Sequence, residues 1–274
     1  MNFNRFQCQQ FLESELGCSD YTQLSTFKDV FSQFVLTSSR VADFKLKAKE
    51  DGKDIYYKAL MTFLEATHGM KLGQSSWPIV KLYYSLFYSL RVYILCSGFV
   101  ILKNGTRDIY GLKLLVGEKP TKITRTGVSG DHKSTIRYFD DLFSHSEKIN
   151  TNKIEGMHVF SWIMDYRELV HYRINSFIEP SFGYDVLPDI FNSVMPYDEY
   201  VNRYLTEPNI AYCFLKEHSI YATPILFLKK AKDKLDSIST GEEILSPERT
   251  EAALSILKKM NLENSLILRD LLFQ

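Results

Sequence analysis

The stretch SSWPIVKLYYSLFYSLRVYILC, residues 75–96, decides the fold of this chain. Its apolar side chains recur at helical spacing and cover most of the circumference, which predicts a helix at the centre of a hydrophobic core. A serine at its start can cap the free amides, Pro78 falls in the first turn, and Gly98 can end the helix. The polar residues within the stretch make it too polar for a membrane span.

Helical periodicity continues on both sides of this stretch. The positions of apolar residues predict further helices over residues 22–36, 53–68, 131–143, 153–177, 186–205, 210–237 and 246–272. The last of these has a clear start signal in Ser246-Pro247-Glu248, with a capping serine, a proline at the first position and an acid in the first turn. Residues 99–116 differ, because two apolar runs flank the turn dipeptide Asn104-Gly105 and predict a short β-hairpin.

The predicted fold class is therefore mainly α: a helical bundle with a small β-hairpin insertion and a helical C-terminal region. Pro180, Gly183 and Pro188 cluster near the middle of the chain. This cluster predicts a division into a helical domain over residues 1–180, which includes the N-terminal helices, and a helical C-terminal region over residues 181–274.

The composition excludes several classes of protein. The 274 residues are 45% hydrophobic and 14% aromatic, which is typical of a globular domain and excludes disorder, collagen and coiled-coil rods. Lys and Arg number 33, as do Asp and Glu, so the formal net charge is zero. Proteins that hold nucleic acid by non-specific charge usually carry a basic excess, so any nucleic-acid contact must be local.

The cysteines and the N-terminus indicate a reducing compartment. The four cysteines are scattered without CxxC or His-linked spacing, which argues against a zinc site and a disulfide scaffold. The first residues lack a basic region followed by an apolar run, so no secretory signal is visible. We expect a soluble, cytoplasmic protein with no membrane contact and no bound metal or cofactor.

The segment FSWIMDYRELVHYRINSF, residues 160–177, carries the strongest candidate for chemistry. Arg167 and His171 are four residues apart, so a helix places them one turn apart on its apolar side. Such a pair can hold a phosphodiester oxygen with the arginine while the histidine moves a proton near neutral pH. In the alternative interpretation Arg167 is a buried ion and His171 bonds a backbone carbonyl. The carboxylate partners considered for that ion are Asp140, Asp141 and Glu65.

A second candidate lies at the start of the helix predicted from residue 131. His132 and Lys133 can bind an anion there through free amides and local charge, or they can be a solvated cap region. Residues 127–134 nearly form a phosphate-binding P-loop, but His132 stands where the second glycine is needed, so no ATP site is expected. With Arg173, these two residues are the candidates for substrate or partner binding. Four tyrosines of the central helix can stack bases, but their spacing in a leucine-rich stretch is typical of a core; they are Tyr83, Tyr84, Tyr88 and Tyr93.

Three segments taken together resemble the HEPN superfamily of small all-α domains: SSWPIVKLYYSLFYSLRVYIL, GDHKSTIRYFDDLF and DYRELVHYR. The resemblance covers about residues 72–178. It implies that two protomers combine an Arg-(four to six residues)-His motif from each into a metal-independent ribonuclease. Arg167 and His171 match the motif arginine and histidine, although only three residues separate them here.

The resemblance also implies a biological setting with two alternatives. In the first, the chain is a component of a bacterial antiviral defence or toxin–antitoxin system and cuts RNA. In the second, it is a non-catalytic scaffold or regulatory subunit that binds a partner ATPase or nuclease in a multi-component anti-phage complex. The expected partners are a second copy of the chain in a homodimer, or the subunits of such a complex, together with RNA in the first alternative.

Overall fold

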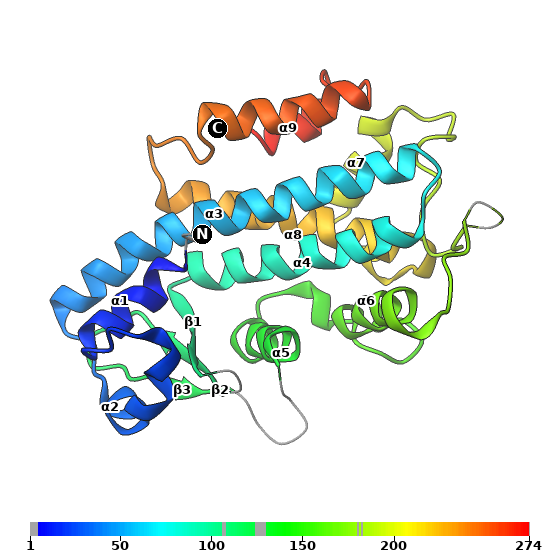
Figure 1. Ribbon diagram of the computed structural model, residues 1–274. Coiled ribbons are helices and arrows are strands. Elements are labelled where there is room, and N and C mark those ends of the chain that lie inside the picture. Colours follow the sequence, from blue (N-terminus) through cyan, green and yellow to red (C-terminus); the bar gives the residue numbers. More distant parts are fainter. Residues whose placement is uncertain (1–4, 106–107, 124–129, 180, 182, 274) are drawn as a thin grey trace.

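The computed structural model describes residues 5–105, 108–123, 130–179, 181 and 183–273. Helices dominate it, and a small antiparallel sheet with strand order β1-β2-β3 packs at one end (Figure 1), so the mainly α fold class is confirmed. The helices are α1 (Gln7–Glu15), α2 (Lys28–Gln33), α3 (Ser38–Lys71), α4 (Ser76–Cys96), α5 (Asp131–Phe143), α6 (Val159–Glu168), α7 (Tyr197–Thr206), α8 (Lys216–Ile238), α9 (Pro247–Lys259) and α10 (Leu266–Asp270). The strands are β1 (Phe99–Asn104), β2 (Asp108–Lys113) and β3 (Thr121–Lys122).

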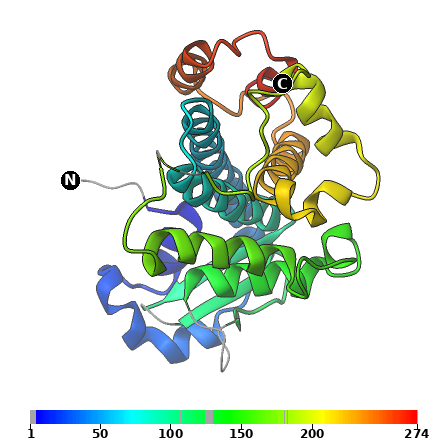
Figure 2. The ribbon, with the colours of Figure 1, turned by 90° about the vertical axis from the view of Figure 1, so that its right-hand side faces the viewer.

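The central helix forms as the sequence predicts. α4 packs against α3 and α8, and its leucines, including Leu82 and Leu90, lie in the hydrophobic core. Figure 2 shows α5 and α6 on one side of these three helices and α9 on the other. The expectation that this stretch is too polar for a membrane span is wrong by composition: among the described helices, α4 alone is long and apolar enough to cross a membrane. Most of that window is buried inside the protein. Its apolar surface is thus used in packing.

The N-terminal helices differ from the prediction. α3 begins at Ser38, where the side chain of Thr37 accepts a hydrogen bond from the amide of Arg40, and so extends well before residue 53. The added turns were missed because they bury only a narrow stripe that includes Val41 and Phe44 among many charged residues. The helix expected over 22–36 is instead a 3₁₀ segment, Tyr21–Phe27, followed by the short α2.

The predicted hairpin is confirmed. β1 and β2 pair antiparallel, and Gly105 takes a positive φ of 73° at the turn. α5 packs on this sheet so closely that a Cβ at Gly111 would collide with the ring of Tyr138. Residues 106–107 and 124–129 lie outside the described residues, and with them the first three positions of the P-loop-like stretch 127–134.

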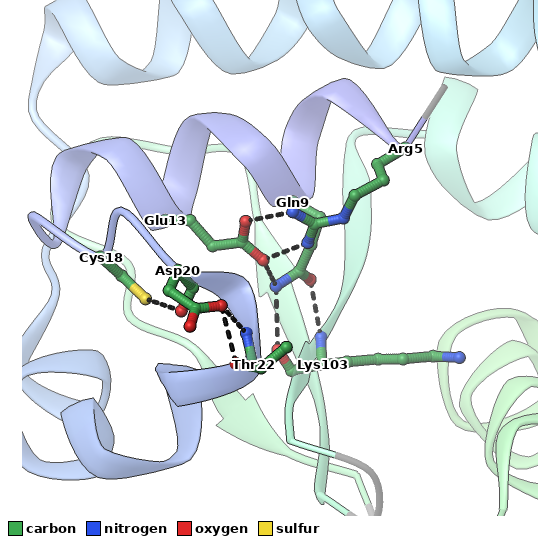
Figure 3. Close-up of polar contacts among 7 residues, drawn as sticks. All are labelled: Arg5, Gln9, Glu13, Cys18, Asp20, Thr22 and Lys103. Carbon is green, nitrogen blue, oxygen red and sulfur yellow. Dashed lines mark hydrogen bonds and ion pairs between the residues drawn. The ribbon is translucent and has the colours of Figure 1, made fainter. Parts of the chain in front are cut away.

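A polar network joins α1 to the free edge of β1 (Figure 3). The side-chain amide of Gln9 donates to the backbone carbonyl of Lys103 and accepts from the backbone amide of Lys103, both at 2.9 Å. It thus makes the two hydrogen bonds that a neighbouring strand would make at this edge. Glu13 accepts from Gln9 at 3.1 Å and from Arg5 at 2.8 Å. The side chain of Lys103 points away from this network, which leaves its ammonium free for a contact on α5.

The helix predicted over residues 153–177 is wrong at both ends. An isolated bridge joins Ile154 to Met157 across a turn at Glu155 and Gly156, both with positive φ, so α6 begins only at Val159. After Glu168 the chain forms a π-helical turn, Leu169–Arg173, in which the amide of Ile174 donates to the carbonyl of Leu169 at 3.2 Å.

The C-terminal helices are shorter than predicted. α7 begins at Tyr197, and α8 begins at Lys216 after the 3₁₀ segment Ala211–Phe214. α9 begins at Pro247 with Ser246 as its cap, as predicted, but Asn261 takes a positive φ and separates it from α10. α8 packs along α3 and α4, and its apolar residues belong to the same core as theirs.

Candidate functional site

Arg167 is buried, and the described residues offer it no counter-ion. Its side chain comes from the last turn of α6 and is 7% exposed. The guanidinium lies over the ring of Tyr83 at 4.8 Å from the centroid, with Tyr172 at 5.6 Å and Tyr84 at 6.0 Å. In the described part of the chain no carboxylate forms an ion pair with it, and its Nε has no hydrogen-bond partner. The residues outside that part include no Asp or Glu.

None of the carboxylates considered as partners of Arg167 pairs with it in the described part of the chain. Glu65 pairs with Lys81 at 2.9 Å, and Asp141 pairs with Arg137 at 3.1 Å. Asp140 lies 3.8 Å from Nε2 of His158, and its buried Oδ1 has no hydrogen-bond partner among the described residues. The expectation of a carboxylate partner for Arg167 is therefore wrong, because α6 directs this side chain toward the tyrosines of α4.

His132 is the titratable neighbour of this arginine. It is the second residue of α5, its Nδ1 lies 2.7 Å from Oη of Tyr83, and its ring stacks on Phe87 with centroids 4.2 Å apart. Burial lowers the pKa of His132 below its ordinary value, and the positive charge of Arg167 lowers it further. The imidazole is consequently neutral at neutral pH, which is the form that can accept a proton.

Tyr83 joins the two groups. Its side chain is 1% exposed, so it is a core residue, but its hydroxyl faces His132. Burial raises the pKa of the Tyr83 phenol, and the nearby Arg167 charge opposes this only in part, so the hydroxyl stays protonated. When Nδ1 of His132 donates to the tyrosine oxygen, Nε2 carries a free lone pair. Within the described residues, Nδ1 is the ring nitrogen of His132 that has a hydrogen-bond partner.

Asp131 fixes the start of α5 and hence the position of His132. Its carboxylate pairs with Arg91 of α4 at 3.1 Å and with Lys103 of β1 at 2.8 Å. Burial by itself would raise the pKa of Asp131, but the charges of Arg91 and Lys103 outweigh burial and hold the pKa below its ordinary value. An ionised carboxylate at this position is also favoured by the helix dipole. Gln9 hydrogen-bonds the backbone of Lys103 (Figure 3), and this fixes the residue whose ammonium pairs with Asp131.

The structure distributes the residues singled out from the sequence in an unexpected way. Arg167 and His171 do not stack on one helix face, because the π-helical turn between them changes the register. His171 is exposed and contacts Trp77, with ring centroids 5.9 Å apart, and stacks on Tyr172 at 4.3 Å. Lys133 is exposed, and Arg173 pairs with Glu168 at 3.1 Å.

The site thus unites Arg167 with His132, two residues that the sequence suggested for different roles. No signal in the sequence pointed to Asp131, and the spacing of the tyrosines indicated a core without showing which hydroxyl would face a histidine. Within the described ranges, no group of three or more His, Cys, Asp or Glu side chains is placed to hold a metal ion.

Comparisons with known proteins found no relative of this chain. No protein-family model matches this chain, and no match was found among curated proteins or solved structures.

Proposed function

We propose that this chain is a metal-independent ribonuclease of the kind that the HEPN resemblance implies, with Tyr83, His132 and Arg167 as its site. The observation that carries the proposal is the burial of Arg167 without a counter-ion among the described residues. A buried cation without a counter-ion costs several kcal/mol, which its contacts with tyrosine rings offset only in part, and a bound anion would offset the rest. An RNA phosphodiester is an anion that also brings a 2′-hydroxyl to the adjacent imidazole.

The reaction follows from the protonation states of these groups. Nε2 of His132 takes the proton of the ribose 2′-hydroxyl, and the 2′-oxygen then bonds to the adjacent phosphorus. The bond from phosphorus to the 5′-oxygen breaks, and this oxygen takes a proton from water. The products are a 2′,3′-cyclic phosphate and a 5′-hydroxyl, and His132 returns its proton to solvent. Arg167 stabilises the charge that develops on the phosphoryl oxygens, and Tyr83 holds the imidazole through Nδ1.

The wider setting is part of the same proposal. The resemblance favours a component of a bacterial defence or toxin system. The two-fold pairing of protomers that it implies stays a prediction.

Cleavage of single-stranded RNA by the purified chain, with and without a chelator, tests the proposal. We expect cleavage with 2′,3′-cyclic phosphate ends, unchanged by the chelator and reduced at least about 100-fold in His132→Ala and Arg167→Met, as for loss of a general base or charge-stabilising group. His145→Ala is the matched control. His145 is an exposed histidine beyond the other end of α5, and the helix separates the two histidines by about 16 Å at 1.5 Å per residue.

Three outcomes would reject the proposal. The first is absence of cleavage together with absence of RNA binding. The second is cleavage that depends on an added divalent ion. The third is a His132→Ala variant that cleaves as fast as His145→Ala while both melt like the wild type.

A further inference from the structure

Four aromatic side chains form an exposed row beside the proposed site. We call Phe177, Trp77, His171 and Tyr172 the aromatic row. Ring centroids are 5.5 Å apart between Phe177 and Trp77, 5.9 Å between Trp77 and His171, and 4.3 Å between His171 and Tyr172. Trp77 is 45% exposed, Phe177 44% and Tyr172 66%. Large aromatic rings with this exposure are unusual unless they meet a partner.

The row is held in place by the fold. Trp77 lies in the first turn of α4, and Phe177 lies in the segment after α6. Glu179 of that segment accepts a hydrogen bond from the amide of Ser75 at 2.5 Å and from both the amide and the hydroxyl of Ser76. These bonds cap α4 and bind the segment to it. The rings are therefore presented on a fixed surface.

The aromatic row is continuous with the ribonuclease site. Tyr172 lies at one end of the row, and the Arg167 guanidinium is 5.6 Å from its ring centroid. The same guanidinium lies over Tyr83, whose hydroxyl contacts His132. A ligand that follows this surface thus meets flat rings first, then a cation, and then a neutral imidazole. Unpaired RNA offers the matching order of groups, because flat bases are attached to a chain of anionic phosphates.

We infer that the aromatic row is a stacking platform for unpaired bases next to the scissile phosphate, and that the substrate is therefore single-stranded RNA. The inference rests on the proposed function and adds the class of its substrate. It also gives His171 a role, since an exposed imidazole that stacks on Tyr172 and lies tilted against Trp77 contacts bases while His132 performs the proton transfer. Bases in a duplex stack on one another and are unavailable to such a platform.

Binding of labelled RNA to the full-length His132→Ala chain tests this inference without cleavage. Fluorescence anisotropy compares three probes: a short oligouridylate, the same strand annealed to its complement, and a strand of equal charge with abasic positions. Stacking on one ring is worth about 1–3 kcal/mol per base, so we expect Trp77→Ala to bind the oligouridylate about 5- to 150-fold more weakly. We expect a similar loss for His171→Ala, and partial recovery in Trp77→Phe, which keeps a flat ring.

The probes and a matched control separate stacking from other effects. The abasic strand should bind the His132→Ala chain weakly and should lose little further affinity in Trp77→Ala. Tyr21→Ala is the control, because Tyr21 is 58% exposed and belongs to the 3₁₀ segment Tyr21–Phe27. This segment lies beside α2, away from the first turn of α4 (Figure 1). The Tyr21→Ala variant should bind the oligouridylate with the same affinity as the parent His132→Ala chain.

The outcomes distinguish the inference from the proposed function. If the oligouridylate binds and Arg167→Met abolishes binding, but Trp77→Ala and the abasic strand bind like the parent, the stacking platform is rejected and the ribonuclease proposal stands. Equal binding of the duplex also rejects the platform. If the row variants change only the oligomeric state in light scattering, the row is a protein interface and the inference is overturned. Absence of any RNA binding or cleavage rejects both proposals.

Discussion

Replacing Arg167 by Met separates a functional cation from a structural one. Met has a similar length and no charge, so it fills the space among the tyrosines without leaving a large cavity. The substitution removes the contacts of the guanidinium with Tyr83, Tyr84 and Tyr172. At about 0.5–1 kcal/mol each, and up to about 2 for a desolvated pair, this loss amounts to about 2–3 kcal/mol.

The same substitution also removes the cost of a buried charge. That cost is several kcal/mol for an ion without a counter-ion, and no carboxylate in the described residues is left unpaired by the change. We therefore expect the free energy of unfolding of Arg167→Met to stay within about 1.5 kcal/mol of the wild type. Urea denaturation measures it directly, and the melting temperature should move by no more than about 5 °C.

Arg91→Met is the matched control for this measurement. Arg91 is buried to nearly the same degree, at 8% exposure, but it pairs with Asp131. Breaking a buried pair costs about 3–5 kcal/mol, and Asp131 keeps Lys103 as a partner, so we expect a loss of about 2–3 kcal/mol. If Arg167→Met destabilises the protein by 3 kcal/mol or more on the scale of that control, about the loss from a broken buried pair, the guanidinium is satisfied within the fold and the reasoning is refuted.

Three further predictions concern the surroundings of the site. The pKa of His132, followed by NMR titration of its ring protons, should lie below 6.5. It should rise toward that value in Arg167→Met, because the arginine charge lowers the pKa of the imidazole. An unchanged pKa in this variant would show that the two groups do not interact. Burial raises the pKa of Asp140 to about 6, so ionisation of this carboxylate at pH 7.5 costs the folded protein stability. Asp140→Asn should therefore stabilise the protein by up to about 2 kcal/mol at pH 7.5, and the gain should shrink as the pH falls toward 5. Equal gains at both pH values would contradict a buried carboxylate. Gly111→Ala should destabilise the protein by about 1–3 kcal/mol in a thermal melt, because its methyl group collides with Tyr138, and Tyr138→Ala in the same chain should recover part of that loss.

The sequence by itself determined the elements whose signals are local. α4 was predictable because its apolar residues cover most of a helix circumference and a serine precedes a proline at its start. The hairpin was predictable because Asn104-Gly105 separates two apolar runs, and the start of α9 because Ser246 precedes Pro247. Each of these signals depends on neighbours within one turn of the chain.

Only the tertiary structure decided which groups meet at the site. Arg167 and His132 are 35 residues apart, and they come together because α5 and α6 both pack on α4 and because Asp131 ties the first turn of α5 to Arg91 and Lys103. The i, i+4 spacing of Arg167 and His171 predicted a stacked pair, but the π-helical turn in this segment turns His171 outward. Periodicity reports the register within one regular helix; it carries no information on a change of register inside the helix or on the rotation of one helix against another, since both follow from packing.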